Sequence, residues 1–400
     1  MALTNAHNAH NAHNAHNAHN AHNAHSAAIE VDQALMAQAL TIAREGIVDA
    51  SPPPAKIPDR VPLSPARRLR RIEYDFAQSI LLSEMLDSLT IVPAPKNSPL
   101  KHVELLARDQ RCNKDICHDA DNGGDAGDGA GADASDCGEK ICRRDMRLLR
   151  LSQPTDQDFA EELKLILGYA TLRSERLPEI TVQTADIVSF FTPMLPIEVQ
   201  RARAVHYLID LVLNLSTAIV QRIKLAFDAP RPDVLSDQVQ PMLPMPLHAS
   251  YPSGHATQAF AVAMLLTILT REDPAQVAEI SPDSQLFRMA ARIAVNRTVA
   301  GLHFPSDSVA GALLGITLAR WIAVRAGASS PHCCSMDFHA GKWGDKAPGG
   351  SRDFYLSRLC AVLKGHDPCL TIDHPVTGPD SVLIAGIWEM AQDEWRDRWS

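Results

Sequence analysis

The chain has 400 residues, of which 46% are hydrophobic, so it is long enough to bury a sizeable core and to fold as a globular protein. Its formal net charge of −9 at pH 7 argues against a general nucleic-acid-binding protein. We therefore expect no nucleic-acid partner, although local clusters of basic residues can still hold small anions.

The N-terminal segment, residues 1–28, is dominated by a low-complexity tract. Residues 5–25 are seven consecutive Asn-Ala-His triplets without any apolar periodicity that could build a core. We expect this segment to be disordered, and we interpret the repeat as a sequence expansion rather than as a metal-binding device. The first residues also lack the basic and apolar stretches of a secretory signal, which favours a cytoplasmic location.

Helical periodicity is the main pattern in the rest of the chain. Apolar residues recur at three- and four-residue spacing in 34–47, 72–89, 159–172 and much of 197–326. No segment shows a run of alternating strand residues, so we expect an all-α fold, a helical bundle spanning residues 29–328 with an active site at helix ends. The longest apolar runs are short or interrupted by polar residues, so we expect no membrane span.

Two further segments have a different composition. Residues 110–143 form a Cys/Asp/Gly-rich insertion with cysteines at 112, 117, 137 and 142, whose spacing is compatible with two disulfides or with a zinc clip. The Asp-rich centre of the insertion favours a solvated loop over a calcium site. Residues 329–400 are rich in Gly, Pro, Cys and His, and we interpret them as a C-terminal accessory extension with short helices at 352–363 and 381–396.

The residues with chemical potential fall into three short segments within residues 199–326. In chain order these are Lys224-x6-Arg231-Pro232, Pro252-Ser253-Gly254-His255 and Arg297-x5-His303-x3-Asp307. An oxyanion such as phosphate or vanadate needs its oxygens neutralised by fixed donors, and one lysine and two arginines supply such donors. The set therefore predicts an oxyanion-binding active site.

Local sequence indicates how each segment presents its side chains. Pro230 and Pro232 end the first helix, so Lys224 and Arg231 can face one pocket. Ser253 and Gly254 precede an apolar run, which predicts a helix N-terminus whose free amides bind an anion. In the third segment His303 and Asp307 are four residues apart, which suits a histidine held by a carboxylate.

The order and spacing of these segments resemble the superfamily of type 2 phosphatidic acid phosphatases and vanadium-dependent haloperoxidases. This resemblance implies that His303 is the nucleophile or the vanadium ligand, that Asp307 orients it, and that His255 is the opposing acid or base. It also implies that the oxyanion is held by Lys224, Arg231, Ser253, Gly254 and Arg297. One departure is Asn296, where the family usually has serine, and we expect this change to tune the site rather than abolish it.

His248 bears on the choice between the two chemistries of that superfamily. It lies seven residues before His255, as does a second histidine in bromide-oxidising vanadium haloperoxidases. The alternative interpretation is that His248 is a partly exposed loop histidine without a catalytic role. We expect a vanadate-dependent haloperoxidase that uses peroxide and halide, with His248 among its catalytic residues. A soluble acid phosphatase that hydrolyses phosphomonoesters without a cofactor is the alternative, and a catalytically silent anion-binding protein is a third. The sequence leaves the oligomeric state open.

Overall fold

The computed structural model describes residues 62–398 apart from 96–97, 99, 109–144, 274–276, 329–332, 346 and 366, together with 35, 37–39, 41 and 42. The predictions made for the Asn-Ala-His repeat and for the Cys/Asp/Gly-rich insertion at 110–143 therefore concern residues outside the described part of the chain. The three segments of the candidate site all lie within it.

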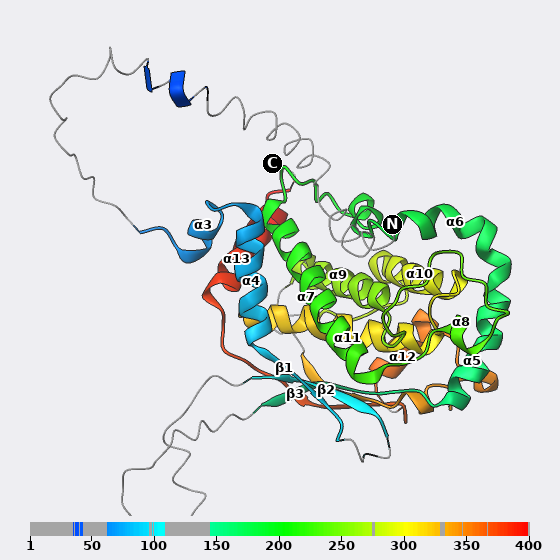
Figure 1. Cartoon of the computed structure of the whole chain (residues 1–400). Helices are drawn as coiled ribbons and strands as arrows, with labels where there is room; N and C mark the ends of the chain where they lie inside the picture. The colour runs from blue at the N-terminus through cyan, green and yellow to red at the C-terminus, as the bar shows by residue number, and fades with distance from the viewer. Residues whose placement is uncertain are drawn as a thin grey trace, which may run out of the picture.

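Helices make up most of the described chain (Figure 1). The α-helices are α3 (Pro65–Leu69), α4 (Tyr74–Asp87), α5 (Asp156–Tyr169), α6 (Arg173–Val182), α7 (Arg203–Phe227), α8 (Pro232–Leu235), α9 (Gly254–Thr270), α10 (Gln285–Val299), α11 (Pro305–Arg325), α12 (Leu356–Leu363) and α13 (Val382–Arg396). The strands are β1 (Leu89–Pro93), β2 (His102–Ala107), β3 (Met146–Ser152), β4 (Cys334–Phe338) and β5 (Leu370–Pro375).

The expectation of an all-α fold is wrong, because these strands form one five-stranded mixed sheet in the order β1-β2-β3-β4-β5. The pairs β1/β2, β2/β3 and β4/β5 are antiparallel, whereas β3 and β4 are parallel. The sheet runs along one side of the helical bundle (Figure 1). The protein is therefore a mixed α/β structure with a large helical core.

The strands were not predicted from the sequence because they are short and because some of them pair with strands that are far away in the sequence. Strand β2 has the alternating burial of a half-exposed strand, but it has only six residues, so its alternation is a weak signal in the sequence. The parallel register pairs Leu149 with Met336, so the two partners lie almost 190 residues apart in the chain. Because nothing in either segment alone specifies that partner, local pattern could not predict the sheet.

The helical core consists of α7, α9, α10 and α11. Every residue of α11 except Arg320 is buried, and α11 packs closely along α9. Two glycines of α11 allow this close approach: a Cβ atom at Gly311 would lie 2.5 Å from the carbonyl oxygen of Ser253, and one at Gly315 would overlap the carbonyl oxygen of Thr257. The contact brings the N-terminal ends of α9 and α11 together, and both ends carry predicted site residues.

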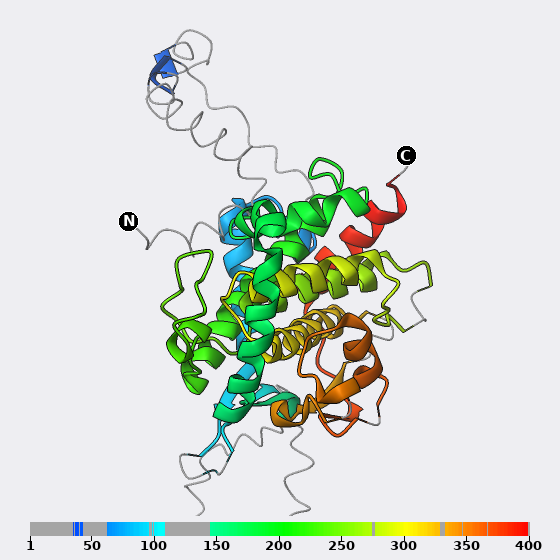
Figure 2. The ribbon, with the colours of Figure 1, turned by 90° about the vertical axis from the view of Figure 1, so that its right-hand side faces the viewer.

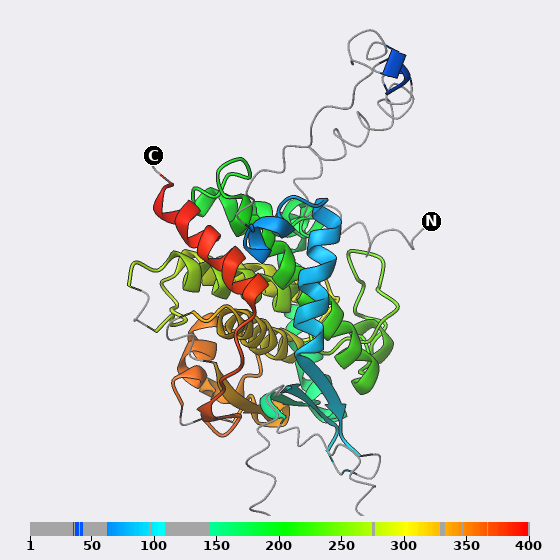
Figure 3. The same cartoon turned by 90° about the vertical axis from the view of Figure 1, so that its left-hand side faces the viewer.

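The C-terminal segment packs against this core. The part that includes β4, α12 and β5, coloured orange, forms a lobe beside α10 and α11 (Figure 2). Helix α13, coloured red, lies with α4 against α7 on another face of the bundle (Figure 3). Residues beyond 332 therefore complete the sheet and cover the helical core.

Two helices meet the length and composition expected of a membrane span, contrary to the expectation that no segment would. They are Arg203–Leu235 and Pro305–Arg325, and 67% and 94% of their apolar windows are buried inside the fold. Core helices of soluble proteins have the same length and composition, so this finding is weak evidence for a membrane span.

Candidate active site

Lys224 lies near the end of α7 and is almost fully buried. The helix ends at Phe227, and Asp228 takes a left-handed conformation just before the proline-containing turn. The Lys224 ammonium donates hydrogen bonds to the carbonyl oxygens of Ala249 and Ser250, at 2.6 and 2.7 Å. Burial holds the pKa of Lys224 well below its ordinary value. These contacts attach the end of α7 to the loop that precedes α9.

Arg231, the residue before α8, connects the second and third segments. Its Nε donates to the carbonyl oxygen of His248 at 3.1 Å, and Nη1 donates to that of Leu302 at 2.7 Å. Each terminal nitrogen also meets an imidazole: Nη1 lies 3.2 Å from Nε2 of His303, and Nη2 lies 3.0 Å from Nδ1 of His248. Burial lowers the pKa of Arg231 to about 10, so the side chain remains a cation near neutral pH.

The second segment forms the N-terminus of α9, as predicted from its sequence. Ser253 is the N-cap residue, and its hydroxyl accepts a hydrogen bond from the amide of Ala256 at 3.4 Å. The amide of Ser253 donates to the carbonyl oxygen of Asp307 at 2.9 Å, which joins the ends of α9 and α11. A cis peptide bond between Tyr251 and Pro252 precedes this end. Gly254 follows as the first residue of α9.

His303 and Asp307 form the expected histidine–carboxylate pair at the start of α11. Nδ1 of His303 lies 2.8 Å from Oδ2 of Asp307. The same carboxylate oxygen accepts hydrogen bonds from the amide of Phe304 at 3.0 Å and from the hydroxyl of Ser250. Burial raises the pKa of Asp307 to about 6, and the hydrogen bond from Ser250 opposes this rise. The carboxylate is thus fixed by three donors.

These contacts determine which nitrogen of His303 carries the proton. Burial holds the pKa of His303 well below its ordinary value, and Arg231 and Lys224 lower it further, so the ring is neutral near pH 7. Nδ1 faces the Asp307 carboxylate and must donate, whereas Nε2 faces a guanidinium N–H and must accept. The unprotonated Nε2 is the atom required of a nucleophile or a metal ligand.

Arg297 has the clearest capacity to bind an anion. Its Nη2 donates to the carbonyl oxygen of Ile180 at 3.2 Å and to Oε1 of Gln183 at 2.9 Å. Its Nε and Nη1 are buried and have no hydrogen-bond partner among the described residues. Burying a polar donor without an acceptor is costly, so this arrangement suits an oxyanion such as phosphate or vanadate, which would supply the missing acceptors. Burial lowers the pKa of Arg297 to about 10.

His255 and Asn296 are held by residues of α6 and its C-terminal end. Nε2 of His255 lies 3.1 Å from the carbonyl oxygen of Gln183. The amide of Asn296 donates to Glu179 at 3.0 Å and to Gln183 at 3.1 Å. Because Gln183 also contacts Arg297, it connects the predicted acid or base with the predicted anion-binding arginine.

Sequence reasoning missed Gln183 and Ser250 as parts of this site. Ser250 lies between His248 and Ser253, and its small polar side chain just before the second segment was an available signal. Gln183 is far upstream of the three segments, between the predicted helical stretches 159–172 and 197–326, where the sequence contained no signal. Only the packing of α6 against α10 places it beside the site.

The structure thus brings Lys224, Arg231 and His248 together with His303 and Asp307, while Gln183 connects His255 and Arg297. The charge of a bound oxyanion would be balanced by the side chains of Lys224, Arg231 and Arg297.

No group of three or more His, Cys, Asp or Glu side chains that could hold a metal ion occurs within the described ranges. Two surface cavities, of about 580 and 330 Å³, are lined by residues other than those of the candidate site.

A comparison with known protein families finds a match in the part of the chain that carries the candidate site. The family model described as the PAP2 superfamily matches residues 205–329, a range that includes all three segments. No curated protein matches the chain. Members of this superfamily are generally phosphatases or haloperoxidases. Residues 205–329 are thus similar to the PAP2 superfamily, in agreement with the resemblance found in the three motifs.

Proposed function

We propose that this protein is a vanadate-dependent haloperoxidase, which oxidises halide with hydrogen peroxide. The observation that carries the proposal is the position of His248. One guanidinium, that of Arg231, contacts both His303 and His248, at 3.2 and 3.0 Å. A second imidazole therefore lies next to the groups that would hold the oxyanion, which is more than expected of an unrelated loop histidine.

The electrostatics of His248 agree with such a role. Burial, together with the charge of Lys224, lowers its pKa to about 4, so the ring is neutral over most of the pH range. A neutral imidazole beside the anion can accept a proton or a hydrogen bond from an incoming group without repelling Arg231.

The chain's own residues have separable tasks in this proposal. Lys224, Arg231 and Arg297 neutralise the oxygens of the anion, and the α9 N-terminus adds backbone N–H donors. His303 presents its unprotonated Nε2 because Asp307 holds the Nδ1 proton. Vanadate bound there would supply the activation of peroxide for oxygen transfer to halide. His255, held at the carbonyl oxygen of Gln183, would exchange a proton at the site.

Hydrolysis of phosphomonoesters is the second candidate, favoured by the unprotonated Nε2 of His303. In that reaction Nε2 would attack phosphorus and form an N–P bond while the ester P–O bond breaks, and His255 would give a proton to the leaving alcohol. Water would then attack phosphorus, break the N–P bond and return a proton to His255. No cofactor is needed for this reaction.

The deciding experiment compares both reactions on one preparation. We would measure bromination of a dye with peroxide and bromide, with and without orthovanadate, and hydrolysis of a chromogenic phosphomonoester. Vanadate-dependent bromination is the expected result. Phosphate release that vanadate inhibits would assign the protein to the phosphatases instead, and tight binding of orthovanadate without turnover would indicate the silent anion-binding protein.

The variant His248→Ala sharpens this comparison. We expect it to lower bromination by about 10-fold or more, because contacts just outside the ligand set often contribute 10- to 100-fold. Orthovanadate affinity measured by calorimetry should change less, since the cations remain. A variant that brominates as fast as the wild type would remove the observation on which the haloperoxidase assignment depends.

A further inference from the structure

A buried carboxylate on α5 holds the start of α11 next to the candidate active site. Glu162 has no exposed surface, and its Oε2 accepts two hydrogen bonds from Ser306, from the amide at 3.0 Å and from the hydroxyl at 2.8 Å. Ser306 is the second residue of α11 and directly precedes Asp307. The carboxylate therefore satisfies a free amide of this helix end and opposes its positive dipole.

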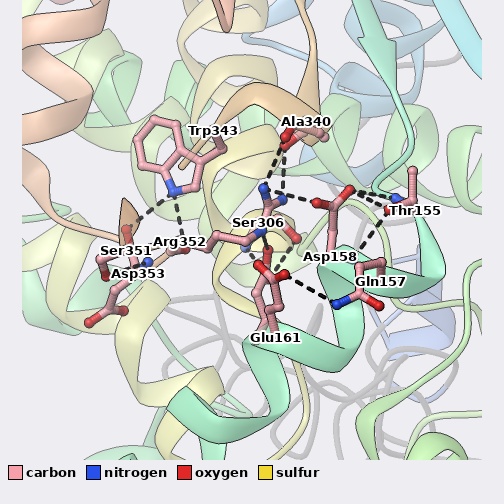
Figure 4. Close-up of polar contacts among 12 residues, drawn as sticks. Thr155, Gln157, Asp158, Glu161, Ser306, Ala340, Trp343, Ser351, Arg352 and Asp353 are labelled. Carbon is pink, nitrogen blue, oxygen red and sulfur yellow. Dashed lines mark hydrogen bonds and ion pairs between the residues drawn. The ribbon is translucent and has the colours of Figure 1, made fainter. Parts of the chain in front are cut away.

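The partner of Glu162 comes from the C-terminal segment. Arg352 donates from Nε to Oε1 of Glu162 at 2.9 Å, and its Nη1 forms an ion pair with Asp158 at 3.1 Å. Nη2 donates to the carbonyl oxygen of Ala340 at 2.9 Å. Figure 4 shows Arg352 reaching from the C-terminal segment towards Asp158, Ala340 and Ser306. Two carboxylates of α5 and a carbonyl oxygen of the C-terminal segment thus converge on one guanidinium.

Arg352 is itself firmly placed. Trp343, which is fully buried, donates its indole N–H to the carbonyl oxygens of Arg352 and Asp353, at 3.1 and 3.2 Å. The carboxylate of Asp353 accepts a hydrogen bond from Tyr169 at the end of α5, at 2.9 Å. The C-terminal segment is therefore attached at both ends of α5, and the guanidinium is held in one position against Glu162.

The charge of Glu162 depends on this arrangement. Burial raises its pKa to about 7, and Arg352 is the strongest influence that lowers it. Asp307 raises it, and Glu162 in turn contributes to the raised pKa of Tyr251. Without Arg352 the carboxylate would be buried without a cation, which favours its protonated form and disturbs its two hydrogen bonds to Ser306.

We propose that Glu162 and Arg352 are positioning residues of the active site: through Ser306 they hold the start of α11, and with it Asp307 and His303, in the geometry that presents the imidazole to the oxyanion. The inference rests on the proposed function, because it assigns a role to groups outside the matched segment that serve the same site. It also gives the C-terminal segment a function in catalysis beyond completing the sheet.

The test uses the full-length chain and four variants: Glu162→Gln, Arg352→Met, Arg352→Lys and Arg358→Met. Arg358 is the matched control, because it donates to the Trp343 carbonyl at 2.7 Å and stacks on the same indole but does not contact Glu162. For each protein we would measure the melting temperature, the orthovanadate affinity by calorimetry and kcat and KM. The ¹⁵N chemical shifts of His303, assigned by comparison with His303→Ala, report its tautomer.

Glu162→Gln and Arg352→Met should weaken orthovanadate binding and lower kcat by about 10- to 100-fold, the usual cost of losing a group that orients a ligand. Their His303 spectra should show a mixture of tautomers, whereas the wild type shows Nδ1–H alone. Arg352→Lys should recover part of the loss, because it restores a cation beside Glu162. Arg358→Met should lower the melting temperature without changing affinity or tautomer.

Two outcomes would overturn the inference. One is a single His303 tautomer and unchanged affinity in Glu162→Gln and Arg352→Met; the other is an equal loss of affinity in Arg352→Met and Arg358→Met at a temperature where both are folded. Failure of the proposed function has a different signature. In that case the wild type would neither bind orthovanadate nor turn over substrate, while its His303 tautomer would still respond to Glu162→Gln if the positioning role is real.

Discussion

Residues 205–329 and the parts of the chain around them contribute to the candidate active site in different ways. The matched segment supplies the groups that would touch the substrate, and each lies at or near a helix end: Lys224 in α7, Ser253 before α9, and His303 and Asp307 at α11. The surrounding parts supply Gln183 and Glu162, which touch those groups or the backbone beside them, and Arg352, which binds Glu162. The residues that would act on the substrate are therefore close together in the sequence, whereas the residues that hold them in place come from distant parts of the chain.

The sheet also helps to hold the site residues in place. Tyr251, just before the α9 segment, donates its hydroxyl to the carbonyl oxygen of Ser152 at the end of β3, at 2.8 Å. The Ser152 hydroxyl accepts a hydrogen bond from the amide of Ala340 at 3.0 Å. The loop that carries Ser253 is thus connected to β3 and to the C-terminal segment. Changes to the residues that would touch the substrate and changes to the packing that supports them should therefore separate chemistry from stability.

Replacing His303 with alanine should produce the largest effect on activity. We expect a fall in kcat on the order of 10³-fold or more, because no other described residue presents an unprotonated nitrogen in that position. The melting temperature should change little, since Asp307 keeps its hydrogen bonds from Phe304 and Ser250. His374→Ala, at an exposed histidine of β5, is the control and should leave kcat unchanged. Appreciable turnover by His303→Ala would contradict the role given to this residue.

Gly315→Ala should have the largest effect on stability. The added methyl group would overlap the carbonyl oxygen of Thr257, so α9 and α11 must move apart. Overpacking of this kind costs roughly 1–3 kcal/mol, and for a chain of this length we expect a melting temperature lower by about 2–4 °C. Gly168→Ala on α5 is the matched control, because a Cβ atom there has nothing within 4 Å, and it should be neutral or slightly stabilising. Equal melting temperatures for the two variants would contradict the close packing of α9 and α11.

Glu162→Gln should change how the stability of the protein depends on pH. We expect this effect to be smaller than the two described above. The pKa of Glu162 is raised from its ordinary value of 4.5 to about 7, so its contribution to stability is present below pH 4.5 and is lost as the pH rises through 7. Glutamine does not titrate, so Glu162→Gln should gain stability relative to the wild type across this range, with a smaller shift in melting temperature than that of Gly315→Ala. Calorimetric scans at pH 4.5 and 7.5 would measure the difference. A difference that does not change with pH would show that Glu162 has an unperturbed pKa.

Much of the helical framework followed from local pattern. The periodicity of 72–89 and 381–396 corresponds closely to α4 and α13, and the prolines at 230 and 232 mark the end of α7. The spacing of His303 and Asp307 predicted their contact, because residues four apart on a helix face one another. These features depend on neighbouring residues only, so a single sequence is sufficient to predict them.

The sheet and the support of the site were decided by tertiary structure. Strands β3 and β4 pair across almost 190 residues, and Glu162 meets Arg352 from the far end of the chain. Gln183 reaches Arg297 only because α6 packs against α10. Such contacts depend on which surfaces the folded chain brings together, and no local spacing encodes that choice. The sequence by itself therefore determined the candidate chemical groups and their helix ends, whereas only the tertiary structure determined what holds them in place.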